Sequence, residues 1–535
     1  MGAGVLLVGI IGVLSVGCPG GSSSGTSGGP TKSTTAEASE QKCTDFLQSV
    51  LDIFQLNKLG VSAQVSDGVR LLNQWQRDCG QRVSNRMDGS DLAPVAFPAL
   101  DGSVAKSFSP EQLEQLKAER YSIQDGERLR DAVLFRKVSE FAVGSADNDL
   151  GRVVNVFDHV VCNVDLVLKH YEDLPLTPYE CFTFGSGTAE DRAWILVSIL
   201  RQLKIDAVVL TPPSDKSADT AGGPLVVGVL LNDQVYLFEP RLGLPLRSVA
   251  GGAPTAASAA NVATLAQMQS MPDLLKQFDV DPSKPSATSL DWLSSPAVAI
   301  VGDTSTFSSR MRQLQPQFSG ARATVISDPL HDVDGAAGLL SRVAKAGAMH
   351  WKSDSLHLWP YPESQIVAYA SLTDDQQGKL KGLKQVWDAP RVADPTSRTR
   401  KLLQARIAQL GGNYNDAIGA YTLVRVSGRA VSGQPISGID QFVNNQASDH
   451  AFFWKGICQF ENGDVKEAKD TFEKYLTQSK PGLWQAASRY QLARSQAATG
   501  DFAAAIATLE ATPENDHRRV GHLLLAREWR QRLKK

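Results

Sequence analysis

Hydrophobic residues recur at helical spacing along most of the chain, and only its centre departs from that pattern. The spacing predicts a helical hairpin over residues 42–85, where "DFLQSVLDIF" and "VSDGVRLLNQW" supply the apolar faces. Residues 86–110 are rich in Pro, Gly, Asp and Ser and predict a loop. Helical patterns then return, and "LGRVVNVFDHVVCNVDLVL" predicts one long helix. We therefore expect a helical N-terminal region at residues 42–124.

The central segment "FGSGTAEDRAWILVSILRQLKI", residues 184–205, begins with a Gly-rich turn and continues as a strongly apolar helix. Thr188 and Asp191 have the spacing of a capping box. The apolar run that follows leaves little polar surface, so we expect a helix that is buried nearly all round. Glu190, Asp191 and Arg192 fit either a polar ligand pocket or helix capping with a local ion pair, and we favour capping.

Short apolar runs follow this helix and predict strands. "DAVVLTPP" predicts a buried strand that ends at its prolines. "PLVVGVLL" and "QVYLFEP" flank Asn232-Asp233, a two-residue hairpin signal. Further along, "AVAIVGDTSTFSSRMRQLQPQF" predicts a strand, a turn and a helix, and "ARATVISDPL" predicts another strand. These later strands form either a small lobe or an extension of the central sheet, so residues 251–395 are assigned as an α+β extension and connector.

The order helix, strand, loop, strand, turn, strand resembles the transglutaminase-like core, which is a papain-like thiol-enzyme fold. The resemblance covers residues 125–250 and rests on "GTAEDRAWILVSILRQLKIDAVVL" and "LLNDQVYLFEPRLGLPL". It implies a nucleophilic cysteine at the first turn of the helix, a histidine on the first hairpin strand and an acid at the end of the second. Such a nucleophile needs a lowered pKa, which the helix N-terminus and a nearby imidazolium supply.

The positions that the resemblance assigns to these three roles are Ala189, Pro224 and Glu239. A methyl group cannot attack a carbonyl, and no histidine occurs between His170 and His331 to replace the missing base. Only Glu239 keeps a side chain that is capable of its role, which is to orient a histidine. The resemblance therefore implies a degenerate, non-catalytic domain.

Cys181 provides the alternative. It lies shortly before Ala189, on the chain that leads into the helix, and it is the remaining candidate nucleophile. The alternative function is thus a thiol hydrolase or transglutaminase with a rearranged site. Thr188 is a weaker candidate, because its hydroxyl is expected to cap the helix.

Three C-terminal segments share one register: "GGNYNDAIGAY", "ENGDVKEAKDTF" and "ATGDFAAAIATL". In each, a Gly precedes a short polar link, an Ala follows five residues later, and a small residue lies twelve before that Ala. This register resembles a degenerate tetratricopeptide array of about three units over residues 396–535. The positions that carry it are Ala405, Gly412, Ala417, Gly456, Gly463, Ala468, Ala493, Gly500 and Ala505. Such arrays form a curved solenoid with a concave surface, which often binds a protein or peptide partner.

The N-terminal run "MGAGVLLVGIIGVLSVGC" is too short for an ordinary spanning helix and ends in small residues and Cys18. Residues 1–18 resemble a signal peptide with a lipobox-like end, which implies that Cys18 is lipidated in a bacterial lipoprotein. A plain signal peptide and an uncleaved anchor are the alternatives. Residues 19–41 are Gly/Ser-rich with almost no apolar residue, and they predict a flexible tether. We expect an exported protein of the bacterial cell envelope, held at the membrane by this lipid anchor.

Composition narrows the function classes. The chain has 54 basic and 57 acidic residues, a formal net charge of −3, and therefore lacks the basic excess of a nucleic-acid-binding protein. Export permits disulfides, and Cys43 and Cys79 lie at the outer ends of the hairpin helices, where a bridge is expected. Cys162 and Cys181 are a weaker candidate pair. No Cys/His cluster has zinc-ligand spacing, so neither a metal nor a cofactor is expected.

These observations predict an α+β transglutaminase-like core with an N-terminal helical hairpin, followed by an all-α tetratricopeptide-like repeat domain. The expected function is that of a non-catalytic, envelope-anchored binding or scaffolding protein. Its partner is a protein or peptide that binds the C-terminal repeats. A third interpretation makes the chain a subunit of an envelope assembly whose core is purely structural.

Overall fold

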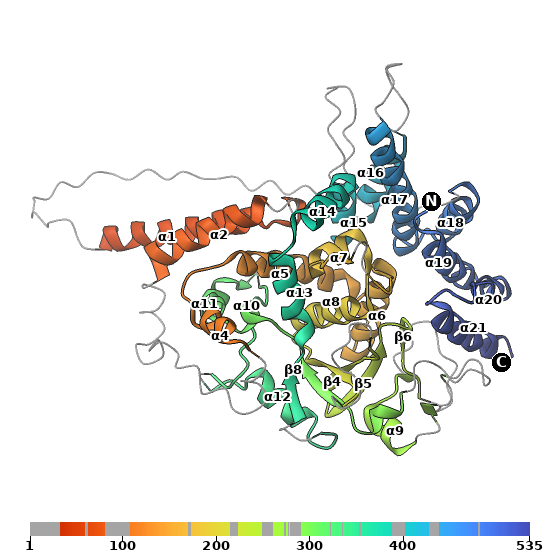
Figure 1. Cartoon of the computed structure of the whole chain (residues 1–535), viewed down its shortest axis with the longest axis horizontal. Coiled ribbons are helices and arrows are strands. Elements are labelled where there is room, and N and C mark those ends of the chain that lie inside the picture. The colour runs from red at the N-terminus through yellow and green to blue at the C-terminus, as the bar shows by residue number, and fades with distance from the viewer. Residues whose placement is uncertain are drawn as a thin grey trace, which may run out of the picture. The chain divides into compact units, whose positions relative to one another are not determined.

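The computed structural model describes residues 33–58, 63–80, 108–169, 173–213, 223–248, 261–271, 290–320, 323–333, 335–351, 355–387, 402–426, 438–479 and 482–534, together with residues 274, 275 and 278 (Figure 1). The chain divides into two compact units, Met1–Asp45 and Phe46–Lys535. The predictions for the signal peptide, for Cys18 and for most of the tether lie outside the described residues. Among the helices that are described, none is long and apolar enough to cross a membrane.

The N-terminal region is helical, as predicted. It contains α1 (Ser33–Ile53), α2 (Ala63–Trp75), the short turns η1 (Leu56–Lys58) and η2 (Gln76–Gly80), and α4 (Pro110–Lys117). The tether prediction is wrong over residues 33–41, because α1 already begins at Ser33. That stretch, "STTAEASEQ", contains Ala, Glu and Gln, which favour helices even where nothing apolar is available to bury. Cys43 and Cys79 are both disulfide-bonded.

Four helices build the helical half of the core: α5 (Ile123–Ala142), α6 (Asp149–Asn163), α7 (Pro178–Phe184) and α8 (Ala189–Gln202). Every residue of α8 is buried, which confirms the predicted all-round burial. The long helix predicted over residues 150–168 is too long, because α6 ends at Asn163. The chain continues there as β1 (Asp165–Leu166), which pairs in parallel with β2 (Ser186–Gly187), just before α8.

A six-stranded sheet in the order β6-β5-β4-β3-β7-β8 lies beside these helices. Its strands are β3 (Ala207–Thr211), β4 (Val226–Leu231), β5 (Gln234–Glu239), β6 (Leu244–Pro245), β7 (Ala297–Ile300) and β8 (Leu356–Leu358). The pairs are antiparallel except for β7 with β8. The hairpin turn predicted at Asn232-Asp233 is confirmed, because both residues have positive φ, as a type I′ turn requires.

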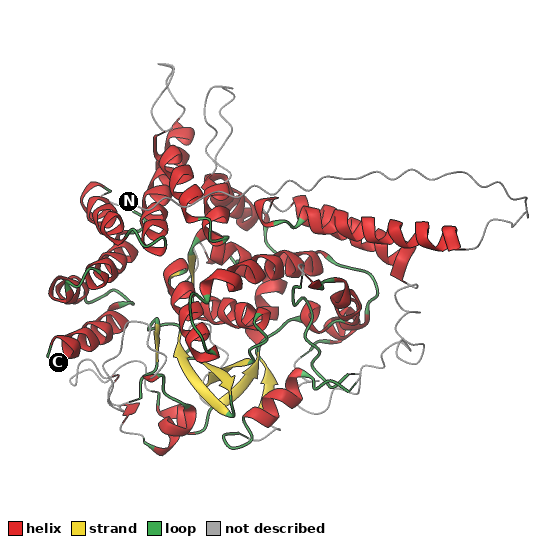
Figure 2. Ribbon diagram, turned by 180° about the vertical axis from the view of Figure 1, so that it is seen from behind, coloured by secondary structure: helices red, strands yellow, loops and turns green. Residues whose placement is uncertain are grey.

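Both faces of the sheet are covered, because successive side chains of a strand point to opposite sides. On one face the ring of Phe238 lies 5.2 Å from that of Phe157 on α6. On the other face Val208, Leu210 and their neighbours share a hydrophobic core with the two short helices α9 (Leu265–Ser270) and α12 (Leu339–Ala346). Figure 2 shows the sheet in yellow with helices on both sides.

The extension enlarges the central sheet, which settles the choice left open by the sequence. Strand β7 pairs with β3, and the predicted turn after it leads into α10 (Thr304–Phe307) and α11 (Ser309–Leu314). The strand predicted in "ARATVISDPL" is wrong, because the described residues 323–330 form no strand. Side-chain amides bind this backbone instead: Gln202 bonds both the N–H and the C=O of Val325, at 2.9 and 2.8 Å. The sixth strand is β8, which the apolar pattern did not indicate.

The C-terminal region consists of stacked helical pairs, as predicted. The members are α15 (Leu402–Leu410), α16 (Tyr414–Val426), α17 (Gly438–Glu461), α18 (Val465–Gln478), α19 (Gln485–Ala498), α20 (Phe502–Glu510) and α21 (Arg519–Leu533). Two further helices, α13 (Pro360–Ala370) and α14 (Asp374–Trp387), precede them.

The residues of the repeat register occupy equivalent positions in successive pairs. Gly412, Gly463 and Gly500 each follow the first helix of a pair with φ between 77° and 88°, the left-handed conformation that ends helices. The alanines of the register, Ala405, Ala417, Ala468, Ala493 and Ala505, are fully buried. A Cβ atom at Gly456 would lie 2.7 Å from the ring of Phe472, so the two helices of that pair require a glycine there.

Candidate functional site

The sequence predicted a degenerate active site at the first turn of α8. Thr188 is the N-cap: its Oγ1 accepts a hydrogen bond from the N–H of Asp191 at 3.3 Å, and its own N–H donates to Asp191 Oδ2 at 2.7 Å. The predicted capping box is therefore present. Ala189 is the first residue of the helix and is only 3% exposed. The methyl group at the position assigned to the nucleophile is thus part of the packed interior.

Tyr361, on α13, covers this turn from a distant part of the chain. Its hydroxyl donates to Asp191 Oδ1 at 2.9 Å and lies 3.4 Å from Thr188 Oγ1. Its ring packs edge-on against Trp194 and stacks on Trp359, with centroids 6.2 and 5.2 Å away. The Asp191 carboxylate therefore lies at the positive end of the helix dipole, where a negative charge is favourable. It also accepts the hydrogen bond that the Tyr361 hydroxyl donates.

Cys181, the alternative nucleophile, lies on α7 and is fully buried. Burial raises the pKa of its thiol well above the ordinary value, and a hydrogen bond to Asp191 and the nearby Glu180 carboxylate raise it further. Cys181 therefore lies close to the start of α8. Its surroundings nevertheless disfavour the thiolate, whereas an activated cysteine has a lowered pKa.

Glu239, the position assigned to the acid, ends β5 and is 2% exposed. Its carboxylate accepts hydrogen bonds from the backbone N–H groups of Arg241, at 3.2 Å, and Leu242. Burial raises the pKa of Glu239 to about 7 in spite of these bonds. Pro224, the position assigned to the histidine, is half-buried just before β4, and Arg241 joins the two segments by donating to the carbonyl of Gly223 at 2.9 Å.

Arg192, one turn into α8, binds main-chain carbonyls rather than serving only a local charge cluster. It donates to the carbonyl oxygens of Val164 at 2.8 Å, Pro240 at 2.8 Å and Val161 at 3.3 Å. Two of these carbonyls belong to the C-terminal end of α6, where a cation satisfies unpaired acceptors and suits the helix dipole. Burial lowers the pKa of Arg192 to about 10, so it stays charged at neutral pH.

Arg406, on the first repeat helix α15, reaches the same end of α6 from the other side. It is fully buried and donates to the carbonyls of Asn163 at 2.9 Å, Phe182 at 2.8 Å and Thr183 at 3.1 Å. A fourth bond, at 3.0 Å, goes to the side-chain oxygen of Asn163. One arginine of the repeats therefore caps the C-terminal ends of two core helices. These contacts also explain why α6 stops at Asn163.

An aromatic contact reinforces this attachment. The guanidinium of Arg406 lies 3.6 Å from the ring centre of Trp454 on α17, which is a close cation–π contact. A Cβ atom on Gly185 would lie 2.0 Å from the same tryptophan ring, and Gly185 has a φ of 80°. Only glycine fits between the end of α7 and the repeats at that point.

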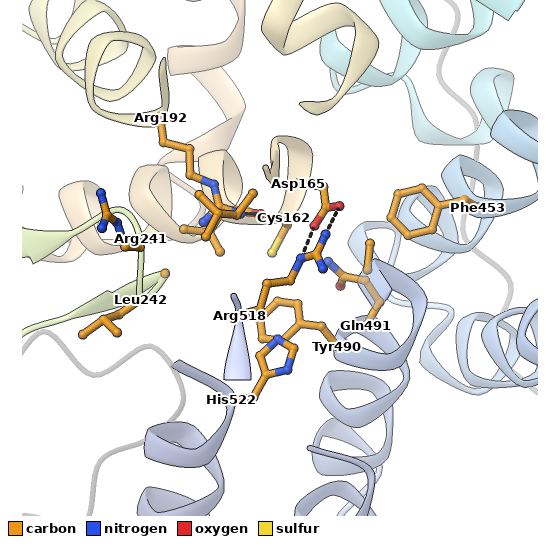
Figure 3. A pocket seen from close by; sticks show the side chains of 14 residues that line it. Cys162, Asp165, Arg192, Arg241, Leu242, Phe453, Tyr490, Gln491, Arg518 and His522 are labelled. Atoms are coloured by element: carbon orange, nitrogen blue, oxygen red, sulfur yellow. Dashed lines mark hydrogen bonds and ion pairs between the residues drawn. The ribbon is translucent and has the colours of Figure 1, made fainter. Parts of the chain in front are cut away.

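The later repeats hold the core by ion pairs. Arg494 on α19 binds Asp158 on α6 at 2.5 Å, and Arg518, directly before α21, binds Asp165 with two nitrogens at 2.8 and 3.0 Å. Figure 3 shows Arg518 directed at Asp165, with Tyr490 and His522 of the repeats beside them. The small cavity at this junction has a volume of about 30 Å³, which is room for one or two water molecules and not for a substrate.

The first helices of the repeat pairs and α21 thus face the core: α15 through Arg406, α17 through Trp454, α19 through Arg494 and α21 beside Arg518. The core therefore contacts the first helix of each successive pair. The roles of Tyr361, Arg406 and Trp454 were not predicted from the sequence. The one signal for them in the sequence is an arginine inside the apolar helix "LLQARIAQL", since a buried arginine needs several acceptors.

Comparison with known proteins supports the C-terminal assignment. Residues 458–528, from the end of α17 into α21, match the model of the tetratricopeptide repeat family. Repeats of this family generally mediate protein–protein interactions. No curated protein and no solved structure matches the chain. The match confirms the predicted repeats over residues 458–528.

Proposed function

We propose that this protein is a non-catalytic binding or scaffolding lipoprotein of the bacterial cell envelope, in which a degenerate transglutaminase-like core supports protein-binding repeats. The observation that carries the proposal is the first turn of α8. Ala189 stands at the position of the nucleophile, and Tyr361 lies over the same turn, hydrogen-bonded to Asp191. Reaction chemistry at this turn would need both a nucleophile and space for a substrate.

The partner surface of the repeats lies at the links between successive helical pairs, because the bodies of α15, α17 and α19 contact the core. Three large apolar side chains are exposed near these links: Phe442 at the start of α17 (62%), Leu483 before α19 (57%) and Leu423 near the end of α16 (43%). A partner peptide or domain that buries them removes apolar surface from water, which favours binding.

The catalytic half of the proposal is tested with the purified full chain in amide-hydrolysis and transglutamination assays. We expect no turnover that depends on Cys181. The matched variant is Cys181→Ala, which removes the thiol at little cost in volume, and Cys458→Ala controls for the loss of another buried thiol. Activity that Cys181→Ala abolishes and Cys458→Ala preserves would contradict the proposal and support the thiol hydrolase.

The scaffolding half is tested by capture from detergent-solubilised envelopes. Phe442→Ser and Leu483→Ser together should reduce the recovery of partner proteins at least fivefold. Met349→Ser, at a side chain that is 90% exposed outside the repeats, is the control and should leave recovery unchanged. Equal recovery with all variants would refute the links between the helical pairs as the binding site. Mass spectrometry of the mature N-terminus, with Cys18→Ser as the control, tests the lipid anchor.

A further inference from the structure

A second cavity lies at the opposite end of α8, away from the first turn. It has a volume of about 350 Å³, within the range of roughly 300–1,000 Å³ that is usual for small-molecule sites. The cavity is bounded by the end of α8, the start of β3, the segment 325–328 and α12. It is more than ten times larger than the 30 Å³ cavity beside Arg518.

Half of the lining of this cavity is apolar. The side chains that form it come from four separate segments and are Val197, Ile205, Ala207, Val325 and Leu339. Four of the five are buried and Val325 is half-buried, so the wall is held by the surrounding core. An apolar wall of this kind accepts the hydrocarbon part of a ligand, at a gain of about 25 cal/mol for each Å² removed from water.

The other half of the lining is charged. Arg342 binds Asp206 through Nε at 2.8 Å and Nη2 at 2.9 Å, and the same Nη2 reaches Asp328 at 3.0 Å. Arg201 binds Asp328 through Nε at 3.3 Å and the carbonyl of Val301 through Nη2 at 2.5 Å. The two carboxylates are therefore already paired with two arginines.

Positive charge is left over in this half of the lining. Within the described part of the chain, Arg201 Nη1 has no hydrogen-bond partner, although the side chain is only 8% exposed. Lys204 lines the cavity as well, and its ammonium has no partner among the residues that the structure describes. Lys204 has a φ of 58°, a conformation that normally selects glycine at the end of a helix.

We propose that this cavity binds an organic anion with an apolar body, a carboxylate about the size of a medium-chain fatty acid. Its carboxylate lies between Arg201 Nη1 and the Lys204 ammonium, where charge-assisted hydrogen bonds satisfy both donors. Its hydrocarbon chain lies along the apolar wall. The inference is independent of the proposed scaffolding role, since no repeat residue and no residue of the first turn of α8 takes part.

Calorimetric titration of the purified full chain with decanoate, below its micelle concentration, tests the proposal. Decanol carries the same apolar body without charge, and acetate carries the charge without the body. We expect decanoate to bind at least about tenfold more tightly than either, because each lacks one half of the recognition. Lys204→Ala should weaken decanoate binding about five- to tenfold, which is the range for one charge-assisted bond at a half-open site.

Two further variants separate recognition from folding. Lys345→Ala, on the exposed side of α12 and outside the cavity, removes the same charge and should leave decanoate binding unchanged. Val325→Trp fills the cavity from its half-buried edge and should abolish binding, with an unfolding midpoint close to that of the wild type. Failure of decanoate to bind at millimolar concentration, or binding that neither Lys204→Ala nor Val325→Trp weakens, would overturn the proposal.

Discussion

The two ends of α8 differ in how completely their polar groups are satisfied. At the N-terminal end Thr188, Asp191 and Tyr361 are hydrogen-bonded to one another, and Arg192 donates to three main-chain carbonyls. At the C-terminal end Lys204 takes a conformation that lysine disfavours, and a cavity of about 350 Å³ adjoins it. The family resemblance assigns its degenerate nucleophile position to the first end, whereas the cavity that we propose as a ligand site adjoins the second. A sequence motif can therefore locate a position in the fold, but the residues packed around that position determine whether it can bind a ligand.

The largest expected effect tests the N-terminal end. Arg192→Leu removes the donor of three buried carbonyls. We expect it to lower the free energy of unfolding by about 3–5 kcal/mol, because each buried acceptor left unsatisfied costs about 1–3 kcal/mol. Urea unfolding followed by circular dichroism measures it. Arg152→Leu, at an exposed pair with Asp149, is the control and should change stability by less than about 1 kcal/mol. Equal midpoints for both variants would show that the N-terminal end is not held by Arg192.

The next effect concerns the glycine that leads into this end. Gly185→Ala forces a Cβ atom into the ring of Trp454 and places alanine at a φ of 80°. We expect a loss of about 2–4 kcal/mol, from left-handed strain and overpacking together. Gly463→Ala separates the two causes, because Gly463 has a φ of 87° and nothing within 4 Å of its Cβ position. It should cost only about 1 kcal/mol. Similar losses in both variants would remove the steric contact with the repeats from the explanation.

A pH profile tests the acid that lies beside the N-terminal end. The pKa of Glu239 is raised to about 7 by burial, whereas an unfolded glutamate titrates near its ordinary value of 4.5. Between these values the unfolded chain has lost the proton and the folded protein keeps it, so stability falls as the pH rises from about 4.5 to 7. Glu239→Gln should flatten this decline by about 1–3 kcal/mol. Thermal melting at pH 5 and pH 7.5 measures it.

The control for that profile is Glu114→Gln, whose side chain is 77% exposed on α4. It should reproduce the wild-type dependence on pH. A Glu239→Gln profile with the full wild-type slope between pH 5 and 7.5 would assign the decline to other groups.

The contrast between the two ends also marks what sequence can predict. The capping box at Thr188 and Asp191, the Asn232-Asp233 turn and the Gly and Ala register depend on residues close together in sequence, and all were predicted. Tyr361 meets Asp191 across 170 residues, and Arg406 meets Asn163 across 243. No local pattern encodes such partners.

The strand predicted in "ARATVISDPL" is absent from the described residues 323–330 for the same reason, because the groups that bind its backbone are distant in sequence. Its apolar alternation is that of a strand, but side chains of Gln202 and Gln315 bind its backbone in place of a neighbouring strand. The prediction of a flexible tether was wrong over residues 33–41 for a reason that is local in sequence. Composition predicted the absence of a core over residues 33–41, but a helix also depends on the intrinsic propensity of its residues, and Ala, Glu and Gln favour one.

The smallest expected effect has the opposite sign and tests the C-terminal end. Lys204→Gly relieves left-handed strain at a φ of 58° and should raise the free energy of unfolding by about 0.5–1 kcal/mol, after the entropy of the more flexible unfolded chain is subtracted. The matched control is Lys345→Gly, the same substitution in the last turn of α12, which should lower stability by about 0.5–1 kcal/mol. Urea midpoints measure both. A stabilising Lys204→Gly that also weakens decanoate binding means that this lysine serves the ligand at the expense of the fold. A destabilising one would mean that Lys204 holds the helix end, as the residues at the opposite end of α8 do.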